Sequence, residues 1–241
     1  MPVIERTAVP SMKQPVMLAG LPGIANVGKL AIDYLIYQLK AKKFLSYYSE
    51  HFPEWALPEA GDVRMMKLEF YHARPQKVKK DFILVSADAQ AATPRGQYVL
   101  AGELLDLAEE YGVKIVGTMA AYVLSPDERK QVDVVGAATT PELVKKMEKN
   151  GIGILQGGVV IGMNGLLPAL ASLRGIDGFC LLGVTEGGLL DPVASANVLK
   201  ALGLMMDLSI DVGELLEQAR PFPSRFPALP QPREEEPSYI G

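Results

Sequence analysis

The sequence predicts an α/β fold in which a largely parallel sheet lies between helices. Short apolar runs alternate with segments of helical periodicity over residues 15–219, a rhythm typical of doubly wound domains. Some runs, such as Phe82–Ala87 (FILVSA), are almost continuously apolar, as strands are when helices cover both faces of a sheet. With 241 residues, 49% of them hydrophobic, the chain can bury a substantial core.

The expected elements follow from apolar periodicity and from helix-end signals. Thr140-Pro141 predicts a capped helix start, Gly112 a helix end, and Asp211 the cap of a last helix. The expected strands are 15–19, 44–49, 65–71, 82–87, 113–119, 157–162 (GGVVIG) and 179–184. The expected helices are about 26–40, 97–111, 140–150, 166–172, 192–208 and 212–219.

The chain divides into a body and a tail. No internal repeat or linker precedes residue 220, so residues 1–220 are expected to form one α/β domain. Residues 221–241 contain six prolines and three consecutive glutamates, a composition that predicts a flexible, Pro-rich acidic tail without a core. The tail ends in Ser238-Tyr239-Ile240-Gly241. Such an arm either reaches a partner or is a solvated remnant.

Charge and composition exclude several classes of protein. A net charge of −4 and a pI near 5.4 argue against nucleic-acid binding, which usually needs a basic face. The single cysteine, Cys180, lies in an apolar run and is expected to be a buried, inert thiol. We find no signal peptide and no uninterrupted apolar run of about 18 residues. The sequence therefore predicts a cytoplasmic protein without a membrane partner.

The segment Gly20–Leu30 (GLPGIANVGKL) almost matches a phosphate-binding loop. Gly23–Lys29 has the pattern G-x-x-x-x-G-K, but Leu30 occupies the position of the Ser or Thr that ligates magnesium. The alternative is a tight strand-to-helix turn. In that interpretation, Gly20 and Gly23 permit unusual dihedrals and Gly28 allows close packing of the helix on the sheet.

Few residues suggest catalysis. The two histidines, His51 and His72, have no carboxylate or cysteine at metal-ligand spacing, and no G-x-S-x-G elbow is present. Ligands of parallel sheets bind beyond the carboxyl ends of the strands, where this chain places Ser86, Asp88, Thr118, Asn164, Thr185 and Glu186.

These polar residues leave two interpretations open. Asp88 and Glu186 could form an acid/base pair if their strands are neighbours, and a nucleoside-type pocket could use Ser86, Asp88, Asn164 and Glu186. Alternatively, the polar side chains cap the helices that follow. We predict no catalytic residue, no metal and no cofactor, and keep a small-molecule enzyme or ligand-binding protein as the alternative function.

Three segments together resemble the PAC2 family, the archaeal relatives of proteasome assembly chaperone 2. They are GLPGIANVGKLA at 20–31, GGVVIGMNGLL at 157–167, and LLGVTEGGLLDPVASANVLKALGLMMDLSID at 181–211. The resemblance covers about residues 16–216. It implies a three-layer α/β sandwich similar to purine nucleoside phosphorylases, but used for binding proteins.

The resemblance also implies a function and partners. We expect an ATP-independent assembly chaperone or core-particle-binding factor that recognises proteasome α subunits and forms homo-oligomers. Proteins that dock on the α ring commonly end in a hydrophobic residue, Tyr and any residue. Here Tyr239 is third from the end, before Ile240 and Gly241, and Ser238 is polar. These last three residues are the predicted partner-binding site. Phe52, Trp55 and Leu57 could form subunit contacts or pack on their own domain.

Overall fold

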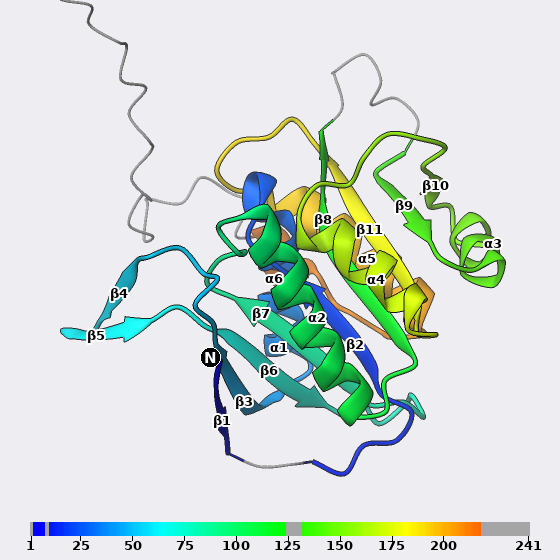
Figure 1. The fold of residues 1–241 in the computed structure, drawn as a ribbon. Helices are drawn as coiled ribbons and strands as arrows, with labels where there is room; N and C mark the ends of the chain where they lie inside the picture. The colour runs from blue at the N-terminus through cyan, green and yellow to red at the C-terminus, as the bar shows by residue number, and fades with distance from the viewer. Residues whose placement is uncertain (1, 8–9, 124–131, 218–241) are drawn as a thin grey trace, which may run out of the picture.

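The computed structural model describes residues 2–7, 10–123 and 132–217. Its main element is a nine-stranded sheet with helices on both faces (Figure 1), in the order β1-β3-β6-β7-β2-β8-β11-β9-β10. The strands of this sheet are β1 (Val3–Arg6), β2 (Val16–Gly20), β3 (Lys42–Tyr48), β6 (Leu68–Ala73), β7 (Phe82–Ala87), β8 (Ile115–Val123), β9 (Val134–Ala138), β10 (Gly153–Ile154) and β11 (Asp177–Thr185). The α-helices are α1 (Val27–Gln38), α2 (Pro94–Glu110), α3 (Pro141–Lys149), α4 (Met163–Leu173), α5 (Pro192–Met206) and α6 (Gly213–Glu217).

The four central strands, β7, β2, β8 and β11, run parallel. On one side β6, β3 and β1 follow β7, and each is antiparallel to the strand before it, so β3 runs in the same direction as β7. On the other side β9 pairs antiparallel with β11. The four parallel strands and β3 therefore end at the same edge of the sheet, which we call the carboxyl edge. The loops at this edge hold most of the candidate site residues.

Helices on the two faces bury two apolar cores. On one face α1, α3, α5 and α6 contribute to the first core, and on the other α2 and α4 contribute to the second. Within β2 and β7, Leu18 and Leu84 face the first core, while Met17 and Ile83 face the second. This alternation follows from the two-residue period of a strand. It confirms the predicted α/β sandwich.

Three helices begin at side-chain caps. Thr93, Thr140 and Asp191 each accept a hydrogen bond from a backbone N–H in the first turn, and proline stands in that turn of each helix. The cap predicted at Thr140 is confirmed. The structure starts α2 at Pro94, three residues before the predicted start at 97, because the Thr93-Pro94 signal is the same as the one at Thr140-Pro141.

The strand predicted at 157–162 is wrong. This segment is a loop in which Val159 is 81% exposed and Ile161 is 85% exposed. Gly158 and Gly162 have φ angles of 90° and 79°, which a β-strand cannot accommodate. The strand nearest to this segment is β10, which has only two residues and pairs with β9. Four further strands of the described chain, β1, β4, β5 and β9, have no counterpart in the prediction.

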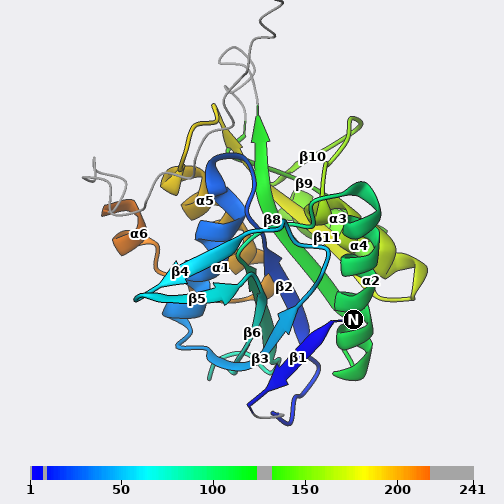
Figure 2. The same ribbon diagram turned by 60° about the vertical axis from the view of Figure 1, so that its left-hand side comes forward.

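A β-hairpin projects from the body between β3 and β6 (Figure 2), where the sequence predicts only a Pro-containing loop before a strand at 65–71. Its strands are β4 (Ala56–Glu59) and β5 (Asp62–Met65). The two-residue turn has positive φ at Ala60 (51°) and Gly61 (94°), as the turns favoured in two-residue hairpins require. β6 then starts at Leu68, so the predicted strand at 65–71 is shifted.

Candidate functional site

Two loops at the carboxyl edge are connected by one side chain. Gln90, in the loop after β7, donates from Nε2 to the carbonyl oxygen of Pro22 (2.7 Å) and accepts at Oε1 from the N–H of Met163 (2.9 Å). Nearby, Asn26 Nδ2 donates to the carbonyl oxygen of Leu189 (3.3 Å). The loops after β2, β7 and β11 and the start of α4 are therefore held together by hydrogen bonds to backbone atoms.

Packing explains the glycine at position 28. A Cβ on Gly28 would lie 2.1 Å from a backbone carbonyl oxygen of β8, and one on Gly20 would lie 2.1 Å from the carbonyl oxygen of Gly28. The predicted role of Gly28 in close helix-on-sheet packing is confirmed. The dihedral freedom expected of Gly20 and Gly23 is not used, because positive φ falls on Ala25 (49°) and Asn26 (48°), while Gly23 is extended at −173°.

Lys29, the lysine of the segment that resembles a phosphate-binding loop, forms its hydrogen bond and ion pair with other side chains of the chain. Lys29 Nζ donates to Ser86 Oγ (2.7 Å) and pairs with Asp33 (2.8 Å), and Ser86 Oγ donates to Asp33 Oδ1 (2.6 Å). Ser86 itself is 4% exposed. The three side chains form a polar bridge between α1 and β7, and the serine hydroxyl is too buried to meet a substrate.

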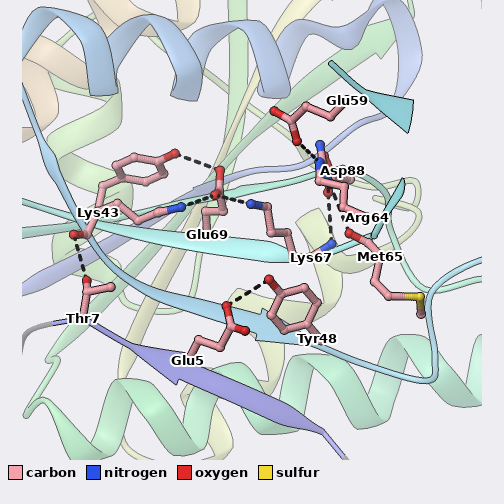
Figure 3. A network of polar contacts seen from close by, with 11 residues as sticks. Glu5, Thr7, Lys43, Tyr48, Glu59, Arg64, Met65, Lys67, Glu69 and Asp88 are labelled. Carbon is pink, nitrogen blue, oxygen red and sulfur yellow. Dashed lines mark hydrogen bonds and ion pairs between the residues drawn. The ribbon is translucent and has the colours of Figure 1, made fainter. Parts of the chain in front are cut away.

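Asp88 anchors the projecting hairpin to the body (Figure 3). Its carboxylate accepts two hydrogen bonds from Arg64, from Nη1 at 2.6 Å and Nη2 at 3.0 Å, and a third from the N–H of Lys67 at 3.0 Å. Arg64 also pairs with Glu59 at 2.5 Å. The hydrogen bonds to Asp88 are the main reason that the pKa of Arg64 is raised, so the guanidinium stays charged and bidentate.

A second carboxylate holds β3 and β6 together beside this anchor (Figure 3). Glu69 is paired with Lys43 (2.9 Å) and Lys67 (2.8 Å) and accepts a hydrogen bond from Tyr71 (2.8 Å). Burial by itself would raise the pKa of Glu69, but these three hydrogen bonds outweigh it and lower the pKa to about 2. Glu69 is thus an ionised structural group, unsuited to proton transfer near neutral pH.

The acid/base pair proposed for Asp88 and Glu186 does not form. Asp88 follows β7 and Glu186 follows β11, and β2 and β8 lie between these strands. A hollow of about 380 Å³ beside β11 and α5 is lined by residues that include Glu186, but not by Ser86, Asp88 or Asn164. The four residues of the alternative pocket are therefore not brought together.

Two of the remaining polar candidates form hydrogen bonds, one to a backbone carbonyl group and the other to the residue that caps a helix. Thr118 Oγ1 donates to the carbonyl oxygen of Asn164 (2.5 Å), and both residues are buried. Thr185 Oγ1 donates to Asp191 Oδ2 (2.7 Å), while Asp191 Oδ1 caps α5. The prediction that these polar side chains cap the helices is therefore wrong: Asp191 caps α5, and Thr185 only supports that cap.

The described residues offer little redox or metal chemistry. No group of three His, Cys, Asp or Glu side chains in ranges 2–7, 10–123 and 132–217 could hold a metal ion. His72 Nε2 lies 3.4 Å from Asp81, and Cys180 is buried, which raises the pKa of its thiol. Nor does any helix in these ranges have the length and apolar character needed to cross a membrane.

The outer face of the hairpin is an exposed apolar surface that was not predicted from the sequence. Val63 is 75% exposed and Met65 is 62% exposed; their cross-strand neighbours Pro58 and Ala56 are exposed as well. Of the three residues predicted as subunit contacts, only Trp55 is exposed, because Phe52 and Leu57 pack on the second core. The Ala60-Gly61 turn between two alternating segments is the signal that could have revealed this hairpin.

Comparison with known proteins identifies the family. The family model described as PAC2 family matches residues 17–226. The chain belongs to the PAC2 family. Among curated relatives of this PAC2 protein, an uncharacterised protein of Methanocaldococcus jannaschii is 36% identical over 211 residues, covering 87% of this chain and 80% of the relative.

Two solved structures from Pyrococcus furiosus share the fold of this PAC2 protein. PbaB, described as an archaeal proteasome activator, superposes with a TM-score of 0.83 at 34% identity, over 90% of this chain and 94% of PbaB. PbaA, described as an archaeal homolog of proteasome-assembly chaperone, superposes with a TM-score of 0.73 at 27% identity, over 91% of this chain and 92% of PbaA. The predicted tail and its site residues, Tyr239, Ile240 and Gly241, lie outside the described residues.

Proposed function

We propose that this PAC2 protein binds proteasome α subunits, or the assembled 20S core particle, without using ATP. It would act as an assembly chaperone or as a factor that binds the core particle. The observation that carries this proposal is the likeness to PbaB, an archaeal proteasome activator, over 90% of the chain with a TM-score of 0.83. The likeness to PbaA, a homolog of a proteasome-assembly chaperone, supports it.

The chemistry of the carboxyl edge supports binding over catalysis. Ser86 is bonded to Lys29 and Asp33, and Asp88 to Arg64, so these polar groups contribute to the fold. By contrast, the hairpin offers an exposed apolar face. Apolar surface of this kind is typical of protein-binding sites.

We propose further that the contact involves the tail and several copies of the chain. Tyr239, Ile240 and Gly241 would form the docking tip at the end of the Pro-rich acidic segment that begins at residue 221. A homo-oligomer would present several such tips to one α ring. Linked binding events gain from a high effective concentration, so weak single tips would suffice.

Binding of the purified chain to core particles and to free α subunits tests the proposal. The full chain should bind both, and a version ending at Arg220, the proposed domain boundary, should bind more weakly. In the full chain, Tyr239→Ala should reproduce much of this loss, whereas the matched change Ser238→Ala should not.

The outcomes separate the two parts of the proposal. Equal binding by the full and shortened chains would place the contact on the α/β domain and contradict the role of the tail. A full chain that binds neither core particles nor free α subunits would contradict the proposed function as a whole.

A further inference from the structure

The hairpin formed by β4 and β5 has the reverse of the usual polarity. Its face toward the body carries Leu57 and Arg64, with Arg64 bonded to Asp88, and beside the turn it also carries Glu59 and Asp62. Its face away from the body carries Val63 and Met65 with two further exposed apolar residues. An antiparallel ribbon with one face in water normally exposes its polar side chains. We call the outward set, Ala56, Pro58, Val63 and Met65, the apolar strip.

The ribbon receives little support from its own body. Leu57 packs on the second core and Arg64 bonds to Asp88, but the extensive contacts of each of the two strands in the described chain are with the other strand. A two-stranded hairpin is marginally stable in water unless something packs against it. Trp55, which precedes β4 and is 56% exposed, extends the apolar surface at the hairpin base. These features indicate that another protein surface covers the strip.

A complementary surface lies at the end of α1. A groove of about 500 Å³ is lined by Ile36, Tyr37, Gln38, Lys40 and Ala41. Lys40 and the following Lys42 are exposed, and neither forms an ion pair within the described ranges. The negative charge of Glu214, and then its hydrogen bond with the phenol, raise the pKa of Tyr37. The groove is therefore an apolar surface with two lysines at its border and the Glu214 carboxylate beside Tyr37.

The hairpin has the opposite charge at its border. Glu54, which precedes Trp55 at the base of the hairpin, is exposed. It has no ion-pair partner in the described part of the chain. The hairpin has an apolar centre with an acidic border, and the groove has an apolar centre with a basic border. The two surfaces therefore match in polarity and in charge.

We infer that the apolar strip of one copy packs into the α1 groove of a second copy of this chain. The inference rests on the proposed self-association and names its interface. The two surfaces differ, so the contact is heterologous: each copy offers its hairpin to one neighbour and its groove to another. Contacts of this kind close into rings when the rotation between neighbours permits it. A ring would present one tail per copy on a shared axis.

Sedimentation velocity over a range of concentrations tests the interface. Val63→Asp should weaken association about tenfold or more, because burying a valine is favourable and burying an unpaired carboxylate is not. Glu54→Lys and Lys40→Glu should each weaken association, and the chain carrying both changes should recover it. Leu204→Asp, exposed on α5 outside both surfaces, is the matched control. Thermal unfolding of each variant verifies that it folds.

Trp55 gives a second readout, because it is the one tryptophan of the chain. Acrylamide should quench its fluorescence less in the wild-type oligomer than in the Val63→Asp variant. An oligomer that survives Val63→Asp with Trp55 accessible would overturn this interface and leave self-association standing. A wild-type chain that stays monomeric would overturn both, without affecting binding to α subunits. Recovery in the charge-swapped double variant supports the inference directly, since no change in fold would restore it.

Discussion

The sharpest stability prediction concerns two glycines of one motif, Gly28 and Gly23. If Gly28 is required by packing, Gly28→Ala must destabilise the protein, because the new Cβ would lie 2.1 Å from the Met119 carbonyl oxygen and 2.9 Å from its carbon. That carbonyl belongs to the centre of the sheet and cannot swing aside. Gly23→Ala meets nothing closer than 3.8 Å at an extended backbone.

The magnitude follows from the two opposing effects. Overpacking of a core costs about 1–3 kcal/mol, and a clash with backbone belongs at the upper end of that range. The better helix propensity of alanine offsets about 1 kcal/mol. The net loss for Gly28→Ala is thus about 2 kcal/mol, or a Tm lower by about 4–8 °C in a domain of this size. Gly23→Ala should stay within about 0.5 kcal/mol of the wild type.

Calorimetry and urea unfolding of the two variants side by side measure the difference. Urea gives the free energy of unfolding and calorimetry the Tm, so a change in the slope of the urea curve would be noticed. A Gly28→Ala variant as stable as the wild type, or a Gly23→Ala variant that loses as much, would refute the packing argument.

Three further changes test other parts of the structure. Gly102→Ala in α2 should raise the free energy of unfolding by about 0.5–1 kcal/mol, since the new Cβ meets only the flexible end of Arg174 at 3.6 Å; thermal unfolding measures this. Arg64→Gln should lower the free energy of unfolding by about 1 kcal/mol, because the bidentate pair with Asp88 is lost. It should also speed the exchange of backbone amide hydrogens in β5, and unchanged exchange would contradict the anchoring role. The pKa of Asp81 is lowered to about 2, because hydrogen bonds led by the one from Arg74 outweigh the effect of burial. This lies below the usual value of about 3.9, so its stabilisation is full above about pH 4 and is lost as the pH falls through about 2. In urea unfolding, the wild type should exceed Asp81→Asn by the same margin at pH 5 and 7, and by a smaller margin at pH 2.5.

The sequence predicted the elements whose periodicity is strong. The run at Phe82–Ala87 became β7 with the predicted boundaries, and the helix expected at 192–208 became α5. The prediction failed where an apolar run has no sheet partner, as at 157–162, or where small residues form a strand, as in β9 (VVGAA). In both cases the outcome depends on which strands lie alongside, and local composition does not contain that information.

The candidate site was harder to predict for the same reason. Asp88 was found from its place after a strand, but its partner Arg64 comes from a hairpin 24 residues earlier. Whether Asp88 could act with Glu186 depended on the strand order, which puts two strands between them. The apolar strip was visible as alternation around Ala60-Gly61, yet a face that points outward from the body has the same pattern as one that points inward.

The turn before α1 has a consequence for synthesis on the ribosome. Ala25 and Asn26 both adopt left-handed backbone, which costs roughly 1–2 kcal/mol for each residue outside glycine. The contacts that hold these two residues involve a segment that is translated much later. The backbone N–H of Asp191 donates to the Ala25 carbonyl oxygen at 3.0 Å, and the Asn26 side chain donates to the carbonyl oxygen of Leu189, 163 residues away. At about 5–20 residues per second, that segment emerges roughly 10–30 s later. The turn before α1 is thus completed only after residues 189–191 have been synthesised, and until then its contacts with that segment are missing.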